Sequence, residues 1–335
     1  MPAPVGAKLP AKVLQAIAFQ CGLAQAGTRP VLAERIQTAA REFQPLTPDA
    51  RILSIDMGLR NFAFSLLSPP KPPPLTQHPS TNKPTPLAHL HAWKRIDLLR
   101  LSAAADSQAS DDFTPSTMAA RAVALVQSRF LPLAPTHVLI ERQRFRSGGA
   151  SGVLEWTLRV NTLEAMLYAA FTTLRAVGAW DGQLVAVPPS RATRFMVGEG
   201  EVGVGGVLLG LEAEGEGVGA KMKQADSKKL KIDLLGRCLE GGRVIELEGA
   251  QVKKAVDDFL EGRAKTATGR SRVKPTETSV KKKKGETVVK SEAGAILTKL
   301  DDLSDSLLQG VAWLEWQRNI GRLHETVPWV LGDPE

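Results

Sequence analysis

The stretch Arg51-Ile-Leu-Ser-Ile-Asp-Met-Gly-Leu-Arg60 decides the fold of this chain. A short apolar run, typical of a buried strand, ends on Asp56. Met57 and Gly58 follow it directly and begin a tight loop. A second strand pattern covers 61–67, and the short connection between the two runs predicts a β-hairpin. The sequence therefore indicates that a sheet begins here and that its first strand ends on a carboxylate.

Three further acids fall at comparable places. Glu141 ends a second apolar strand, Thr136-His-Val-Leu-Ile-Glu141, and Asp302 and Asp305 lie at the start of a predicted helix. Their three-residue spacing places both aspartates on one helix face. Acids on two strand ends and one helix can converge on a pair of divalent cations, and Mg²⁺ prefers such oxygen ligands while leaving room for water and a phosphate. A two-metal site of this kind cleaves phosphodiesters.

The remaining pattern predicts an α/β domain at 50–325, with a mixed five-stranded sheet flanked by helices. Three strands come first, and strands then alternate with helices. Flexible insertions are expected at about 68–86, 198–222 and 262–294, where proline, glycine or charge replaces apolar periodicity. The expected strands cover 51–56, 61–67, 87–98, 136–141 and 183–187, and the expected helices cover 115–131, 152–176, a short piece from 190, 226–240, 250–261 and 296–318.

Residues 1–45 are predicted to form a separate helical module. Two helical patterns within 8–43 are joined by Gly22-Leu-Ala-Gln-Ala-Gly-Thr-Arg-Pro30. This arrangement resembles a SAP motif, a small DNA-binding unit, and a plain helical hairpin packed on the main domain is the alternative. If the module binds DNA, Arg29 and Arg35 are its expected phosphate contacts.

Charge is concentrated in one segment. The net charge is +8, and residues 263–292 hold ten Lys or Arg and three Glu, so this segment carries nearly all of the excess. Its centre, Lys281–Lys284, is interpreted as a phosphate-binding arm, a nuclear localisation signal or a solvated loop. Cys21 and Cys238 show no metal-ligand spacing and are expected to be buried thiols. No apolar run is long enough to span a membrane, so no membrane partner is expected.

The acidic motifs resemble the RuvC-type branch of the RNase H-like nucleases, and their local sequences resemble fungal mitochondrial Holliday-junction resolvases. The segments that carry this resemblance are Ser54–Asn61, Ile140–Arg146 and Asp301–Gly310 with Trp313. It covers about 8–70 and 115–320. The resemblance implies an RNase H-like fold, structure-selective cleavage of four-way DNA junctions, and a homodimer that makes two symmetric nicks.

The resemblance also implies a role for each candidate residue. Asp56, Glu141, Asp302 and Asp305 would be catalytic and would hold two Mg²⁺ per active site, with Mn²⁺ as a substitute. Asp301 lies four residues before Asp305 and is an alternative to Asp302, which is preferred for its three-residue spacing. The residues expected to contact DNA around the scissile bond are Arg60, Arg142, Gln143, Arg144, Arg146, Lys228 and Lys229.

Other functions remain alternatives at this stage. An actin-like or sugar-kinase-like ATPase also opens with Ile-Asp-x-Gly before a hairpin, but no second phosphate loop is evident. A non-catalytic structure-specific DNA-binding protein would not need four acids, and an RNA-processing enzyme of the RuvC-like type fits the SAP-like module less well. The first 33 residues contain no acid, which is compatible with mitochondrial import, while Lys281–Lys284 keeps the nucleus as an alternative.

Overall fold

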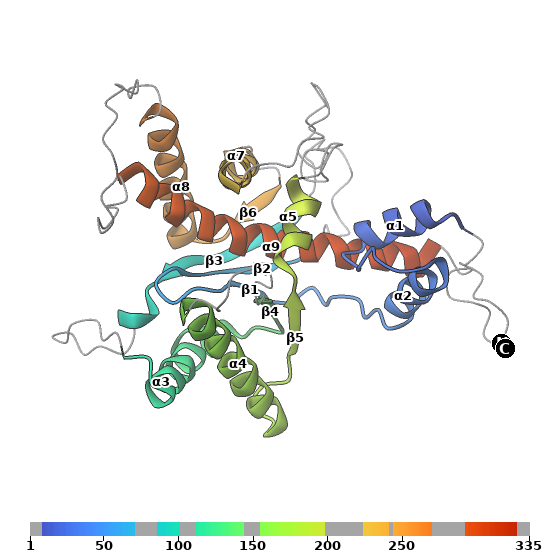
Figure 1. The fold of residues 1–335 in the computed structure, drawn as a ribbon, viewed down its shortest axis with the longest axis horizontal. Helices are drawn as coiled ribbons and strands as arrows, with labels where there is room; N and C mark the ends of the chain where they lie inside the picture. The colour runs from blue at the N-terminus through green and yellow to red at the C-terminus, as the bar shows by residue number, and fades with distance from the viewer. Residues whose placement is uncertain are drawn as a thin grey trace, which may run out of the picture.

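A computed structural model describes residues 9–70, 86–100, 112–143, 155–197, 224–240, 244–269 and 292–326. In these ranges the chain forms a mixed sheet with helices on both faces and a helical pair at one side (Figure 1). The predicted insertion at 198–222, most of the insertion at 68–86 and the Lys281–Lys284 run lie outside the described residues. The α/β class and the mixed sheet are confirmed.

The sheet has six strands in the order β5-β4-β1-β2-β3-β6. β1 pairs antiparallel with β2, as the hairpin prediction requires, and parallel with β4. The predicted count of five strands was one short, because β6 is only three residues long and shows no readable periodicity. It pairs parallel with the start of β3 at the edge of the sheet. The strands are β1 Ile52–Asp56, β2 Phe62–Ser68, β3 Ala88–Ile96, β4 His137–Glu141, β5 Gln183–Val187 and β6 Ile245–Leu247.

Helices cover the two faces of the sheet separately. α3 and α4 lie on one face, and α5, α7, α8 and α9 lie on the other (Figure 1). Side chains alternate along β1 accordingly: Leu53 and Ile55 join the core beneath α3 and α4, whereas Ile52 joins the core beneath α9. The helices are α1 Ala11–Gln20, α2 Arg29–Arg41, α3 Pro115–Leu125, α4 Glu155–Ala176, α5 Pro189–Val197, α7 Gln224–Glu240, α8 Ala250–Gly269 and α9 Glu292–Thr326.

Several helix ends differ from the sequence prediction. The helix expected over 115–131 is α-helical only to Leu125 and continues as a wider π turn, Val126–Phe130, and a short 3-10 turn, Leu131–Leu133. α8 runs to Gly269, so the insertion predicted from 262 starts too early. The sequence prediction ended this helix at 261 because basic residues interrupt its apolar pattern there. An exposed helix needs no continuous apolar stripe, so α8 continues past that point.

α9 crosses the sheet at close range, and small residues make this possible. Ser54 and Ser65 point toward the helix from β1 and β2, and the Ser65 hydroxyl donates to the Ser306 carbonyl over 2.9 Å. A Cβ on Gly310 would lie 2.5 Å from Leu67 Cδ1 and 3.1 Å from Ser54 Cβ. Gln309 Nε2 donates to Ser54 Oγ and to the Ile55 carbonyl, which pins the helix to β1. This contact fixes how far the acids of α9 lie from the end of β1.

The N-terminal helical pair packs on the far half of α9 (Figure 1). Leu14, Ala18, Leu32 and Ile36 form its small core, which Leu323 of α9 completes. Trp313 and Trp316 are buried in the main core. Both cysteines are free and buried, which confirms the thiol prediction. Among the described residues, no helix has the length and apolar character to cross a membrane.

Candidate active site

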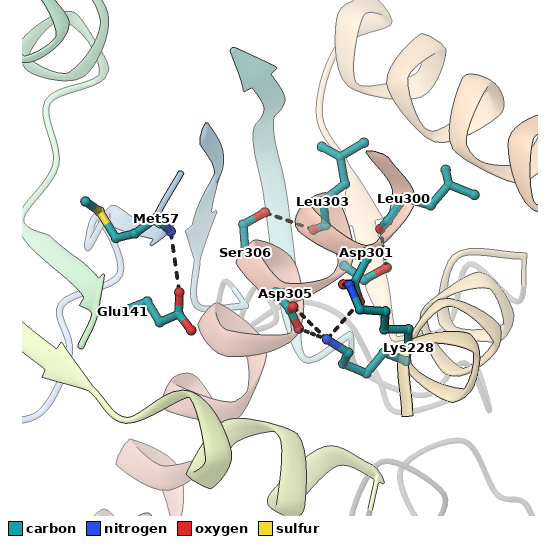
Figure 2. Close-up of polar contacts among 10 residues, drawn as sticks. Met57, Glu141, Lys228, Leu300, Asp301, Leu303, Asp305 and Ser306 are labelled. Atoms are coloured by element: carbon teal, nitrogen blue, oxygen red, sulfur yellow. Dashed lines mark hydrogen bonds and ion pairs between the residues drawn. The ribbon is translucent and has the colours of Figure 1, made fainter. Parts of the chain in front are cut away.

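Asp56 and Glu141 meet at the carboxyl ends of two neighbouring strands. β1 and β4 run parallel with Ile55 opposite Ile140, so the next residue of each strand is an acid at the same edge. Strand alternation turns both side chains toward α9, because Ile52 and Leu139, at even spacing from them, join the core on that face. Glu141 Oε2 accepts from the Met57 amide at 3.5 Å (Figure 2) and from Gln143 Nε2 at 3.2 Å. The two strand-end acids are thus placed by sheet register alone.

α9 adds the third carboxylate to the same cavity. The cavity has a volume of about 320 Å³, and Asp56, Glu141 and Asp305 line it. Its remaining walls come from the start of α5, from Lys231 of α7, and from Leu308 and Gln309 of α9. Figure 2 shows Asp305 between Glu141 on one side and Asp301 with Lys228 on the other. The predicted convergence of acids from two strands and one helix is therefore present for these three residues.

Burial and mutual repulsion raise the pKa values of Asp56, Asp302 and Asp305. The pKa of Asp56 lies well above its ordinary value, first because the carboxyl is desolvated and then because Glu141 and Asp305 carry like charge nearby. Burial raises the pKa of Asp305 to about 6, although the Lys231 ammonium opposes the shift. Burial and neighbouring Asp301 raise the pKa of Asp302 to about 7. A bound cation would stabilise the ionised form of such a cluster of acids.

Lys231 supplies positive charge inside this acidic site. Its Nζ lies 2.6 Å from both carboxylate oxygens of Asp305 and 2.9 Å from Asp301 Oδ1. Burial alone would lower the pKa of Lys231, but the ion pairs with Asp305 and Asp301 outweigh it and raise the pKa. Sequence reasoning missed this lysine. The available signal was its position three residues after Lys228, which puts both amines on one face of α7.

The structure separates the roles of Asp301 and Asp302. Asp301 is buried and forms ion pairs with Lys228 and Lys231, so its charge is already neutralised. Asp301 Oδ1 and Asp302 Oδ2 are both buried without a hydrogen-bond partner among the described residues, but Asp301 Oδ1 lies 2.9 Å from Lys231 Nζ, whereas Asp302 Oδ2 has no such ion pair among those residues. Asp302 does not line the cavity itself, yet its charge acts on Asp56. Because two lysines form ion pairs with Asp301, the geometry favours Asp302 over Asp301 as a metal ligand.

The donor set suits a hard cation such as Mg²⁺. Asp56, Glu141, Asp302 and Asp305 offer only carboxylate oxygens, and the orphaned oxygen of Asp302 needs a partner. Among the residues that the structure describes, no three acidic, imidazole or thiol groups are close enough to form a ready-made metal cage. Lys231 occupies both oxygens of Asp305, so a metal ion would compete with this ammonium for them.

The predicted DNA contacts fall into two groups. Arg60, Arg142 and Lys229 are exposed near the strand ends or on α7, and Gln143 contacts Glu141. Arg144 and Arg146 lie outside the described residues. Arg29 and Arg35 sit in the N-terminal pair, where Arg35 donates to the Ala24 and Ala26 carbonyls and Arg29 donates to the Leu9 carbonyl. Each of these two arginines thus also stabilises its own module, which the sequence did not reveal.

The strand order, the antiparallel hairpin beside a parallel β1–β4 pair and the acids at their ends define an RNase H-like domain. The model of one family matches residues 52–323, which is most of the chain. The chain therefore belongs to the family described as mitochondrial resolvase Ydc2 / RNA splicing MRS1.

Individual relatives agree with this assignment. The cruciform cutting endonuclease 1, mitochondrial, of Schizosaccharomyces pombe is 35% identical over 156 residues, which is 47% of this chain and 53% of that protein. The aligned region thus spans about half the length of this curated relative. The crystal structure of the yeast mitochondrial Holliday junction resolvase Ydc2 superposes with a TM-score of 0.54, 24% identity, and coverage of 94% of this chain and 96% of that one. This likeness shows the fold. A Thermus thermophilus RuvC structure matches 58% of this chain and 97% of its own at 15% identity, but its TM-score of 0.27 is too low to support an inference.

Proposed function

We propose that this protein is a structure-selective endonuclease that resolves four-way DNA junctions by paired, symmetric nicks. The observation that carries the proposal is the shared cavity of Asp56, Glu141 and Asp305 at the end of the sheet. The family and the relative named as a cruciform cutting endonuclease support the same activity. A non-catalytic binding protein would have no need to hold a carboxyl such as Asp56, whose pKa is raised by burial and by neighbouring acids.

Each residue has a definable part in such a reaction. Asp56, Glu141, Asp302 and Asp305 would hold two Mg²⁺, which when bound supply an activated water and stabilise the leaving oxygen. Gln143 and the Met57 amide orient the Glu141 carboxylate. Lys231 neutralises Asp305 and Asp301 and keeps the acids of α9 together before a cation binds. Arg60, Arg142, Gln143, Arg144, Arg146, Lys228 and Lys229 are proposed to grip the phosphates around the scissile bond.

Two further aspects belong to the proposal. Two nicks related by symmetry need two active sites, so the working unit is a homodimer. Residues 1–45 are proposed as a SAP-like module with Arg29 and Arg35 toward DNA phosphates. A mitochondrial location is supported by the names of the relatives, and the nucleus is the alternative because of Lys281–Lys284. A fluorescent fusion imaged beside a mitochondrial marker, with and without these four lysines, distinguishes the two.

The alternatives are less well supported. An actin-like ATPase needs a second phosphate loop, and no such loop is evident in the sequence. The family description also names an RNA splicing protein, so RNA is the more serious competing substrate. It can be compared directly with DNA.

The test is cleavage of a labelled four-way DNA junction, a linear duplex of the same sequence and a four-way RNA junction. We expect paired nicks in the DNA junction only, with Mg²⁺ but not with EDTA, and no nicks from Asp302→Asn. Tight binding of the junction without any cutting by the wild type would refute the nuclease. Preferred cutting of the RNA would replace the DNA substrate.

A further inference from the structure

One short helix stands between the acidic cavity and the N-terminal helical pair. α5 places Ser190, Thr193 and Arg194 in the cavity wall. Arg191 and Phe195, four residues apart, lie on another face of the same helix. Arg191 contacts Gly22, just after α1, and Phe195 contacts Phe19 within α1. An isolated helix of nine residues is marginal in water, so the position of α5 depends on what it packs against.

The contacts between α5 and the N-terminal pair are specific. Arg191 Nη1 donates to the Gly22 carbonyl over 2.7 Å. The Phe19 and Phe195 rings lie 5.7 Å apart between centroids, and Phe195 is fully buried. A charged hydrogen bond and an aromatic pair both depend on orientation. These contacts therefore fix the direction of α5 as well as its distance from the N-terminal pair.

α9 also contacts Phe195 and the segment around Gly22. Phe195 meets Trp316 edge to face at 5.6 Å, and Asn319 Nδ2 donates to the Gln20 carbonyl over 2.7 Å. Gly22 has φ +65°, and a Cβ there would lie 2.1 Å from Trp316 Cδ2. A glycine is therefore needed both for the turn and for the close approach to the tryptophan. The segment 19–22 is thus clamped between α5 and α9, the two helices that line the cavity on this side.

We propose that the N-terminal helical pair is a positioning element of the catalytic cavity, with Arg191 and Phe195 as the residues that transmit its position to α5. The inference rests on the proposed nuclease function and deepens it. The module then controls the rate of cutting through the cavity wall, separately from any contribution of Arg29 and Arg35 to DNA affinity. Arg191 touches no reacting atom in this account and acts only through the placement of Ser190, Thr193 and Arg194.

The test compares Arg191→Met, Arg191→Lys and the control Arg175→Met, an exposed arginine at the end of α4. Junction affinity is measured in EDTA, where no cutting occurs, and the single-turnover cleavage rate is measured with Mg²⁺ at saturating protein, well below the melting temperature of each variant. We expect Arg191→Met to cut about 10- to 100-fold more slowly, since small misplacements in an active site cost about this much. Its affinity should stay within about twofold of the wild type, and Arg191→Lys should recover part of the rate.

A second variant keeps the proposal falsifiable should Arg191→Met fail to fold. Phe19→Leu weakens the same clamp from the module side and should also lower the rate but not the affinity. The double variant should lose less than the product of the two single effects, because both act through α5. Wild-type cutting rates at saturating protein in both single variants would overturn the positioning role, and so would a loss of affinity without a loss of rate. A wild type that does not cut junctions would instead overturn the proposed function.

Discussion

At the scale of single residues, the adjacent acids Asp301 and Asp302 have different surroundings. Asp301 forms ion pairs with two lysines, whereas the buried Oδ2 of Asp302 has neither a hydrogen bond nor an ion pair among the described residues. One residue thus fits a structural role and its neighbour fits a ligand role. Sequence spacing favoured Asp302 but could not decide, because i+3 and i+4 partners of a helical residue share a face.

This division predicts different outcomes for two neighbouring substitutions. Asp302→Asn should reduce junction cleavage at least about 1000-fold, since loss of metal charge stabilisation costs several kcal/mol, and should leave binding of the junction intact. Asp301→Asn should keep cleavage and lower the free energy of unfolding by about 1–3 kcal/mol, because Lys231 loses one charged partner. Cleavage assays and denaturant unfolding of both variants measure this. The reverse pattern would assign the ligand to Asp301.

The raised pKa values predict a pH dependence of stability. Asp305 and Asp302 have pKa values of about 6 and 7 in the folded protein, both above the ordinary value of 3.8. Between about pH 4 and 7 the folded state therefore holds protons that the unfolded state has released, so these groups lower stability as pH rises. We expect the melting temperature in EDTA to fall over this range more steeply for the wild type than for Asp302→Asn.

Metal should reverse this loss. We expect Mg²⁺ to bind the ionised carboxylates, so it should raise the melting temperature more at pH 8 than at pH 5, and cleavage should increase as pH rises through about 6 to 7. Asp258→Asn on the exposed face of α8 is the control and should follow the wild type. An equal effect of Mg²⁺ at both pH values would argue against these acids as its ligands.

At the scale of elements, the close crossing of α9 over β1 and β2 builds the site. Ser54, Ser65 and Gly310 leave the space for it, and Gln309 fixes the register of the helix against β1. Asp305 lies one helical turn before Gln309, and this position places it beside Asp56. The sequence predicted the helix and both strand ends, yet no local pattern states how closely two elements pack.

This geometry predicts the effect of filling the crossing point. Gly310→Val should lower the free energy of unfolding by about 1–3 kcal/mol through overpacking, and should also slow cleavage because Asp305 moves away from Asp56. The control is Gly178→Val, a loop position with φ +71° and no atom within 4 Å. It should lose about 1–2 kcal/mol through backbone strain but cut normally while folded. Equal cleavage by both variants would contradict the role of the crossing.

At the scale of the whole molecule, the proposed homodimer would make two nicks with two separate active sites. Wild-type and Asp302→Asn subunits, distinguished by tags and purified as a mixed dimer, should nick only one strand of a junction. A junction cut on both strands by the mixed dimer would show that one active site serves both strands. Sedimentation of the wild type at several concentrations measures the dimer itself.

The sequence alone predicted five of the six strands, the β1–β2 hairpin and the convergence of Asp56, Glu141 and Asp305, because strand ends and helix faces are read from local periodicity. It also located Arg142 and Gln143 directly after Glu141. Only the tertiary structure decided that Lys231 lines the acidic cavity, that a three-residue strand forms one edge of the sheet, and that Arg35 stabilises its own module. These features depend on contacts between residues far apart in the chain, such as Lys231 with Asp305. Local propensity carries no information about such contacts, whereas the packing of α9 against the sheet determines them.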